Sequence, residues 1–293
     1  MILKDLRQIT VLGLGLLGGS IGLAVLHSIP RVKVVGYTHR PRTRAKARQL
    51  AVATEIVDDI AKSVSAADLV ILATPISTFE KYFSQIAGAL PSGCIVTDVG
   101  STKVWPHRWA AKTLPRNVHY VGSHPVAGSE QRGVEFARDD LFDRAICILT
   151  TTKGTNHKAI QTLRKFWTAL GCCVKLMRPA DHDRIFANVS HLPHVTAAAL
   201  INANNSEELK FAGKGFIDTS RIASGPANIW TDVLLTNASN VTRDIDKIIE
   251  ELSKLKKAIK SQDRKQIENL LGAARNKRAA LINYKIKRRE LIP

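Results

Sequence analysis

The residue best suited to chemistry in this chain is a histidine in a short segment bounded by glycines. Residues 122–128 read Gly-Ser-His-Pro-Val-Ala-Gly, so His124 follows an apolar run directly and is flanked by serine and proline. A histidine at the end of a strand can accept the proton of a substrate hydroxyl as hydride leaves the carbon. A lone loop histidine is more often structural, but a position at a sheet edge favours catalysis. We therefore predict that His124 is catalytic.

A glycine-rich turn near the start of the chain indicates what the protein binds. Residues 11–20 read Val-Leu-Gly-Leu-Gly-Leu-Leu-Gly-Gly-Ser, the pattern that joins the first strand and helix of a dinucleotide-binding fold. The three glycines permit a tight turn, close approach of the pyrophosphate, and packing of the helix on the strand. A glycine-rich core turn without a cofactor is the alternative. The predicted cofactor contacts are Gly13, Leu14, Gly15, Leu16, Leu17 and Gly18.

The end of the second predicted strand bears on the choice between NAD and NADP. An acidic residue there would bind the ribose hydroxyls of NAD. Residues 36–44 read Gly-Tyr-Thr-His-Arg-Pro-Arg-Thr-Arg and include no acid. Since arginine binds a phosphate well, we expect NADP, with NAD as the other possibility. The predicted phosphate pocket is Thr38, His39 and Arg40, and a solvated basic helix start is the alternative explanation.

Two more segments follow predicted strands and should reach the carboxyl edge of the sheet, where ligands bind. Residues 73–76, Ala-Thr-Pro-Ile, add Thr74 and Pro75 to the expected cofactor contacts. Residues 98–103 read Asp-Val-Gly-Ser-Thr-Lys and place Ser101 near a helix start. Serine at such a place is more often a plain N-cap. Its combination with His124 makes Ser101 a candidate site residue.

The second half of the chain offers two motifs that suit an anionic substrate. Residues 190–194, Ser-His-Leu-Pro-His, put two histidines around a proline that should kink a helix and free backbone groups. Residues 218–221, Asp-Thr-Ser-Arg, lie in a predicted loop. A loop arginine near the catalytic edge suits a substrate carboxylate. An interhelical histidine and a solvated arginine are the structural alternatives.

Short apolar runs alternate with helical stretches over residues 1–150, and a last strand follows at 172–177, which predicts an α/β Rossmann-like fold with a parallel sheet. The predicted strands are 9–14, 32–37, 69–74, 94–99, 119–123, 145–150 and 172–177. The predicted helices between them include 42–50, 76–90, 103–113 and 156–170.

From residue 181 onward the pattern is helical, with one loop at 215–226 that is bounded by glycine and proline. The predicted helices are 181–202, 205–213, 227–238, 239–261 and 263–288. We place a boundary near residue 178, between a dinucleotide-binding domain (1–178) and an all-α substrate and dimerisation domain (179–293). The long helices need a partner, which predicts a homodimer.

Composition restricts the class of protein further. The formal net charge is +18, and residues 253–293 hold thirteen lysines or arginines against three acids. Aromatic content is only 5%, so we interpret these lysines as the solvated face of amphipathic helices rather than a nucleic-acid site. The uncharged stretch 9–26 is too rich in glycine for a membrane segment. The four cysteines have no zinc-like spacing, so we expect reduced thiols in a cytoplasmic protein and no metal.

Taken together, these motifs resemble the prephenate and arogenate dehydrogenases of tyrosine biosynthesis. The first motif is shared by many dehydrogenases, and the other four are specific to the family in this order. The motifs span nearly the whole chain, at residues 13–20, 97–103, 124–128, 190–194 and 218–221.

The resemblance implies an oxidative decarboxylation. Hydride passes from substrate C4 to the nicotinamide, and the ring carboxylate leaves as carbon dioxide to give tyrosine or 4-hydroxyphenylpyruvate. It implies that His124 polarises or deprotonates the C4 hydroxyl, and that Ser101 assists it on the nicotinamide side. It further implies that Arg221 binds a substrate carboxylate, while His191 borders the substrate or holds Arg221.

Several alternatives stay open at this stage. The chain departs from NAD-using relatives in lacking the acid after the second strand, and it has no room for a fused mutase or regulatory domain. Tyrosine should therefore inhibit competitively at most.

Arogenate and prephenate are both possible substrates. Another two-domain β-hydroxyacid-type dehydrogenase is a rival, although those enzymes commonly use a helical lysine. A basic nucleic-acid-binding protein with a cofactor fold is a second rival.

Overall fold

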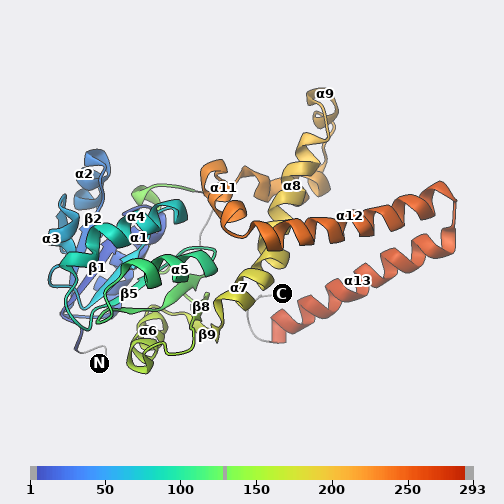
Figure 1. Cartoon of the computed structure of the whole chain (residues 1–293). Coiled ribbons are helices and arrows are strands. Elements are labelled where there is room, and N and C mark those ends of the chain that lie inside the picture. Colours follow the sequence, from blue (N-terminus) through green and yellow to red (C-terminus); the bar gives the residue numbers. More distant parts are fainter. Residues whose placement is uncertain (1–4, 128–130, 288–293) are drawn as a thin grey trace. The chain divides into compact units, whose positions relative to one another are not determined.

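The computed structural model describes residues 5–127 and 131–287, and the chain divides into two compact units. The first unit runs to Ala238 and the second begins at Ser239 (Figure 1). Gly128, which closes the predicted histidine segment, lies outside the described residues. The predicted boundary near residue 178 divides the chain differently and stays a prediction.

The first unit contains a six-stranded parallel sheet, which agrees with the predicted Rossmann-like fold. In spatial order its strands are β3 (Glu55–Val57), β2 (Lys33–Tyr37), β1 (Gln8–Leu12), β4 (Leu69–Leu72), β5 (Ile95–Asp98) and β6 (His119–Tyr120). This order is that of a doubly wound dinucleotide-binding fold, in which the strand order reverses between β1 and β4. Ligands bind at that reversal, so the glycine turn after β1 lies at the expected place. The short strand β3 was not predicted.

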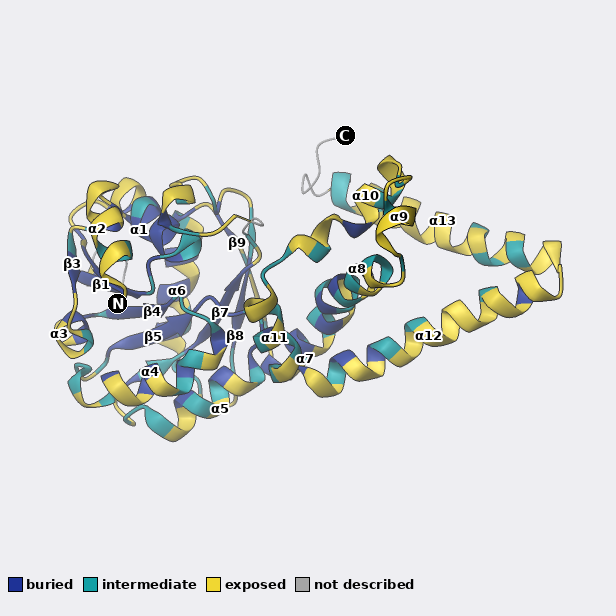
Figure 2. Ribbon diagram, turned by 90° about the horizontal axis from the view of Figure 1, so that it is seen from above, coloured by how far each residue is buried: buried dark blue, intermediate teal, exposed yellow. Residues whose placement is uncertain are grey.

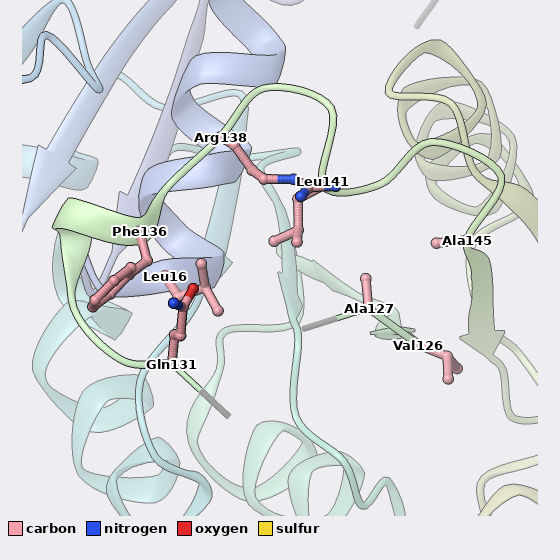
Figure 3. A pocket seen from close by; sticks show the side chains of 8 residues that line it. All are labelled: Leu16, Val126, Ala127, Gln131, Phe136, Arg138, Leu141 and Ala145. Carbon is pink, nitrogen blue, oxygen red and sulfur yellow. The ribbon is translucent and has the colours of Figure 1, made fainter. Parts of the chain in front are cut away.

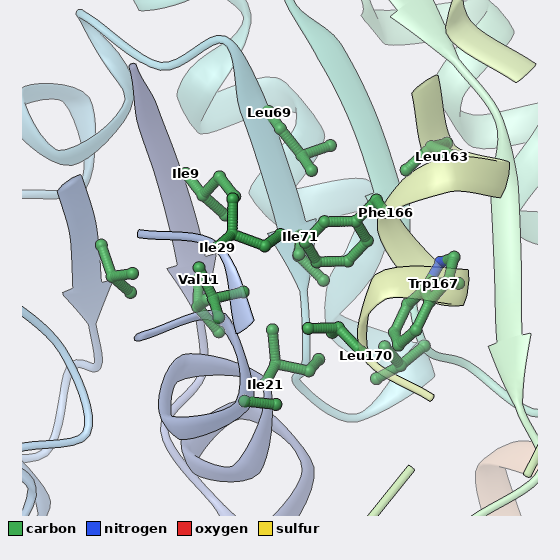
Figure 4. Packing of buried hydrophobic residues seen from close by; sticks show 14 of the residues in the cluster. Ile9, Val11, Ile21, Ile29, Leu69, Ile71, Leu163, Phe166, Trp167 and Leu170 are labelled. Carbon is green, nitrogen blue, oxygen red and sulfur yellow. The ribbon is translucent and has the colours of Figure 1, made fainter. Parts of the chain in front are cut away.

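Helices cover both faces of this sheet, and side chains from alternate strand positions fill two separate cores. They are α1 (Leu16–Ser28), α2 (Pro41–Gln49), α3 (Ile60–Val64), α4 (Phe79–Ile86), α5 (Val104–Thr113) and α6 (His157–Ala169), with short 3-10 turns η2 (Ile76–Thr78), η3 (Ala87–Ala89) and η4 (Val134–Phe136). Ile71 belongs to the core with α1 and α6, shown in Figure 4. Its neighbour Leu72 belongs to the core with Phe79 and Phe83. This alternation is the period of two that a buried strand imposes.

A second, three-stranded sheet holds the predicted catalytic histidine. It consists of β7 (Gly122–Pro125), β8 (Ile146–Thr150) and β9 (Cys173–Met177), with β7 antiparallel and β9 parallel to β8. The prediction of one parallel sheet, with a single strand over 119–123, was therefore wrong. An apolar run shows that a strand exists but not which neighbour it pairs with.

After β9 the first unit continues as helices only. They are α7 (Pro179–Phe186), a π-helical segment η5 (Ala187–His191), α8 (Leu192–Asn202), α9 (Ser206–Leu209), α10 (Lys214–Ser220), a 3-10 turn η6 (Arg221–Ser224) and α11 (Ala227–Thr236). The π-helical segment interrupts the single helix that the sequence predicts over 181–202, and the kink expected at Pro193 stays a prediction. The loop predicted at 215–226 was wrong, because Gly215 lies within α10, η6 follows directly, and Pro226 is the N-cap of α11.

The second unit is a pair of long helices, α12 (Ala238–Lys260) and α13 (Arg264–Lys287), joined by a short turn. Figure 2 shows that exposed residues dominate both helices. Within the described ranges, no helix has the length and apolar character needed to cross a membrane.

Candidate active site

The glycine turn after β1 has the geometry of a phosphate cradle. Gly13 has a φ of +99°, and a Cβ there would lie 2.6 Å from the Ala73 carbonyl oxygen. A Cβ on Gly18 would overlap the carbonyl oxygen of Gly13, so only glycine lets α1 pack this closely. The space beside Gly15 is open, and α1 starts there without a side-chain cap. Backbone N–H groups at such a helix start bind phosphate, so the turn fits a dinucleotide.

A cavity of about 260 Å³ lies beside the start of α1 (Figure 3). Its lining residues are Leu16, Val126, Ala127, Gln131, Phe136, Arg138, Leu141 and Ala145. Ligand pockets commonly measure roughly 300–1,000 Å³, so this cavity has room for only part of a dinucleotide. Of the other leucines in the turn, Leu14 is buried in the core and Leu17 packs against it.

The predicted phosphate pocket lies between β2 and α2. Thr38 is buried, whereas His39 and Arg40 are exposed to solvent. The guanidinium of Arg44 donates a hydrogen bond to the Thr38 carbonyl oxygen at 2.9 Å. This bond holds the backbone at the end of β2 and keeps a second positive charge beside Arg40.

Thr74 and Pro75 lie beside the glycine turn, where the strand order of the sheet reverses. A Cβ on Gly13 would approach the Thr74 methyl group to 2.7 Å. The Thr74 hydroxyl lies 2.8 Å from that of Thr78, which in turn donates to the Pro75 carbonyl oxygen at 2.6 Å. The structure thus brings these two predicted cofactor contacts next to the predicted cradle.

His124 lies on β7 with only 8% of its surface exposed. Its Nδ1 atom is 2.8 Å from Nε2 of His182, and Nδ1 of His182 is 2.8 Å from a carboxylate oxygen of Asp183. The Phe186 ring stacks on His182, with centroids 4.5 Å apart, and also packs against His124. Two imidazoles and a carboxylate therefore form one continuous chain of contacts.

Asp183 also caps a helix from another part of the chain. Its two carboxylate oxygens accept hydrogen bonds from the backbone N–H groups of Lys103 (2.7 Å) and Val104 (2.9 Å) at the start of α5. The helix therefore receives its cap from Asp183, and the reading of Ser101 as an N-cap was wrong. Ser101 itself lies between β5 and α5 and is partly exposed.

Behind His124 lies a buried ion pair. The Lys103 ammonium and the Asp98 carboxylate are fully buried and in contact, and the ammonium also donates to the Ser123 carbonyl oxygen at 2.6 Å. The Tyr120 hydroxyl and the Gly100 N–H donate to Asp98 at 2.6 and 2.7 Å. A buried charge is tolerated when it is paired and hydrogen-bonded in this way. The pair joins β5 to the backbone beside His124.

The histidines of this site are neutral near pH 7. Burial lowers the pKa of His124 well below 6.5, and the charges of His182, Lys103 and His191 lower it further. Burial also lowers the pKa of His182, with Lys103 next in effect. Burial lowers the pKa of His191 to about 4. A neutral imidazole is the form that accepts a proton.

The two predicted histidines of the 190–194 motif are both buried, although their surroundings differ. Nδ1 of His191 lies 3.2 Å from the side-chain amide nitrogen of Asn237, which donates to the Asp183 carbonyl oxygen at 2.7 Å. His194 stacks on Trp230, with ring centroids 3.6 Å apart. Nε2 of His191 and Nδ1 of His194 are buried without a hydrogen-bond partner among the described residues.

The structure connects one of the predicted substrate contacts to the His124 cluster. His191 joins the His124 cluster through Asn237 and Asp183. Arg221 is exposed at the start of η6, a turn that packs against α8. It lies at the end of α10, so its motif is helical where the sequence predicts a loop.

Sequence reasoning missed His182, Asp183 and Asn237. A signal was available for the first two, because buried residues here recur at helical spacing. They are Pro179, His182, Asp183, Ala187, His191 and His194. Two adjacent polar residues on the buried face of a helix need partners, and this marks them as part of a network. Asn237 gives no comparable signal.

The sheet order and the glycine turn define the class, a dinucleotide-binding oxidoreductase. Comparison with known families agrees with this class over most of the chain. Residues 21–176 match the nucleotide-binding domain of prephenate dehydrogenase, and residues 178–273 match its dimerization domain. The chain therefore belongs to the prephenate dehydrogenase family.

Individual relatives support the same assignment. The prephenate dehydrogenase of Bacillus subtilis is 32% identical over 95% of this chain and 76% of its own length. The structure of Aquifex aeolicus prephenate dehydrogenase with hydroxyphenyl propionate and NAD+ has a TM-score of 0.88 and 32% identity, covering 94% of this chain and 98% of that one. Synechocystis arogenate dehydrogenase has a TM-score of 0.81 and 29% identity, covering 94% and 100%.

Proposed function

We propose that this protein oxidatively decarboxylates prephenate or arogenate with hydride transfer to NADP. The observation that carries the proposal is a neutral, nearly buried His124 at the end of β7, in a chain whose relatives are prephenate and arogenate dehydrogenases. A bound nicotinamide would supply the hydride acceptor, and the cradle formed by Gly13, Gly15 and Gly18 would hold its pyrophosphate.

His124 is the proposed general base. Its Nε2 atom takes the proton of the C4 hydroxyl, and the electron pair of the broken O–H bond forms the C4–O double bond as hydride leaves C4. Loss of the ring carboxylate as carbon dioxide then returns an electron pair through the ring to that oxygen, which recovers the proton from His124. An aromatic ring results, which makes the step effectively irreversible.

His191, Arg221 and Ser101 are the proposed substrate contacts. The amide nitrogen of Asn237 faces a backbone carbonyl, so it is the NH2 group, and its second hydrogen is available to Nδ1 of His191. His191 then carries its own proton on Nε2, a buried donor without a protein partner among the described residues. Such a donor suits a substrate carboxylate or carbonyl oxygen. We assign the second anionic contact to Arg221 and contact with the C4 hydroxyl to Ser101.

The proposed preference for NADP rests on the residues after β2. Thr38, His39 and Arg40 offer a hydroxyl, an imidazole and a guanidinium, and residues 36–44 contain no acid that would repel a phosphate. The exposed guanidinium of Arg40 would bind the 2′-phosphate, with Arg44 beside it.

We also propose a homodimer that works in the cytoplasm. The match to a dimerization domain and the exposed apolar side chains of α12 and α13 support the dimer. Four free thiols, three of them buried, support a reducing compartment.

The test is reduction of NADP by the purified protein with prephenate and with arogenate in separate assays, beside a His124→Asn variant. We expect turnover with at least one substrate, a lower KM for NADP than for NAD, and a kcat that falls about 10²–10⁴-fold in the variant. Absence of turnover with both substrates and both cofactors would contradict the function. A lower KM for NAD would contradict the phosphate pocket alone.

A further inference from the structure

We propose that His182 and Asp183 are positioning residues that fix the tautomer of His124, so that the lone pair lies on Nε2, the atom that faces away from His182. The inference rests on the proposed role of His124 as the base. It adds a reason why one ring nitrogen of that histidine, and not the other, meets the substrate hydroxyl.

The argument starts at Asp183, which can only accept hydrogen bonds when ionised. Its carboxylate already accepts from two backbone N–H groups, those of Lys103 and Val104, and a backbone N–H cannot reverse its role. Nδ1 of His182, 2.8 Å from the same carboxylate, must therefore carry its hydrogen and donate.

The direction of this hydrogen bond then fixes the direction of the one between His182 and His124. A neutral imidazole has one N–H and one lone pair, so Nε2 of His182 is an acceptor. Nδ1 of His124 lies 2.8 Å from that acceptor and must donate to it. The hydrogen of His124 is thereby fixed on Nδ1, and the lone pair is left on Nε2.

The charges around the two rings support their neutral forms. Burial lowers the pKa of both His124 and His182, and the positive charge of Lys103 lowers each of them further. His191 and His107 act in the same direction, while the carboxylate of Asp183 faces His182 from the same helix. The positive charge that forms on His124 during proton transfer can be shared through His182 with Asp183.

Because Asp183 also caps α5, its replacement would change a helix as well as a tautomer. His182 is the cleaner position to vary. His182→Phe keeps an aromatic ring that can stack on Phe186 but removes the acceptor for His124. His182→Gln is the matched rescue variant, because its amide oxygen can accept from Nδ1 of His124.

The first measurement is steady-state kinetics of both variants. We expect kcat to fall about 10–100-fold in His182→Phe, with KM changed much less, and to recover to within a few-fold of the parent in His182→Gln. Equal losses in the two variants would overturn the proposal, since they would show that the ring matters only for packing.

The second measurement needs no substrate. Long-range 1H–15N correlation of the histidine rings distinguishes Nδ1–H from Nε2–H, and His124→Asn identifies the His124 signals. We expect Nδ1–H in the parent protein and in His182→Gln. An Nε2–H signal for His124 in the parent would overturn the proposal, even if His182→Phe fails to fold. An Nδ1–H signal in a protein that turns over neither substrate would support the tautomer while rejecting the proposed reaction.

Discussion

The region around His124 and the helical pair α12–α13 differ in the kind of side chain that they bury and expose. Near His124, charged and polar side chains are buried and paired, with Lys103 and Asp98 fully enclosed. On the helical pair, apolar side chains face solvent, among them Leu252 at 57% and Ile259 at 61% exposure. Within the described residues, α13 has no buried side chain.

This difference shows which unit contains the partners of its own charged and apolar side chains. Buried charges are stable only when paired within the same fold, and the first unit supplies every partner of its ion pair. Exposed apolar side chains along a helix face indicate a surface made for association. The ion pair is therefore satisfied within the first unit, whereas the second unit exposes an apolar surface suited to association.

The largest effect that we predict from this comparison is a loss of stability of the first unit as the pH falls. His124, His182, His107 and His191 have lowered pKa values in the folded protein, with His107 and His191 near 4. In the unfolded chain the pKa of each histidine is about 6.5. The stabilisation is therefore fully present well above pH 6.5, and the free energy of unfolding falls as the pH drops from 6.5 toward 4. Each of these histidines contributes a loss of about 1.4 kcal/mol at pH 5.5.

Urea denaturation at pH 7.5 and 5.5 measures this loss. The second unit has no histidine, so the effect should belong to the first unit, and a tryptophan signal will report it because all four tryptophans lie there. Asp183 opposes the trend, since burial raises the pKa of its carboxyl. Equal stability at the two pH values would contradict the neutral, buried state of these rings.

Breaking the ion pair comes next in size. Lys103→Met leaves the Asp98 carboxylate buried without its cation, and we expect a loss of about 3–5 kcal/mol in the free energy of unfolding. The double variant Lys103→Met/Asp98→Asn removes both charges and keeps an acceptor for Tyr120. The double variant should be more stable than the single variant in urea titrations. The reverse order would show that the unpaired Asp98 carboxylate does not cause the loss of stability.

The smallest effect concerns the helical pair. Leu252→Ser removes an exposed apolar side chain whose burial in an interface contributes about 1.5–3 kcal/mol. We expect weaker self-association in sedimentation velocity, with unchanged stability of the first unit. Lys257→Ser, on the same helix, also exposed and turned by about 140° from Leu252, is the control and should associate as the parent does. Loss of association in both, or in neither, would count against α12 as the interface.

Much of the fold was predictable because its main strands are buried on both faces and therefore read as apolar runs. The glycine turn was predictable for a similar reason, since its backbone geometry excludes other residues. The three-residue strand β3 contains Glu55 and escaped notice. The separation of β6 from β7 also escaped, because it depends on which strands lie alongside and not on local composition.

The site was predictable only in its local parts. His124 was proposed from its position after a predicted strand, but its hydrogen-bond partner His182 is 58 residues away in sequence. Lys103 was visible within a motif, yet its burial depends on Asp98, Tyr120 and Ser123 meeting in the folded chain. Long-range polar networks of this kind leave no periodic pattern, so the sequence shows their members without showing their connections.

The π-helical segment Ala187–His191 makes the length of this part of the chain as important as its composition. In an uninterrupted α-helix each residue turns by about 100°, so His191, nine residues after His182, would lie on the opposite side. The wider π-helical turn allows both to be buried in the structure. Deleting one residue here would place His191 eight residues after His182, and an uninterrupted α-helix would then turn His191 only about 80° away from His182. The π-helical turn thus holds one residue more than an α-helix needs, and a further insertion, unlike a deletion, would turn His191 and His194 away from the side of His182.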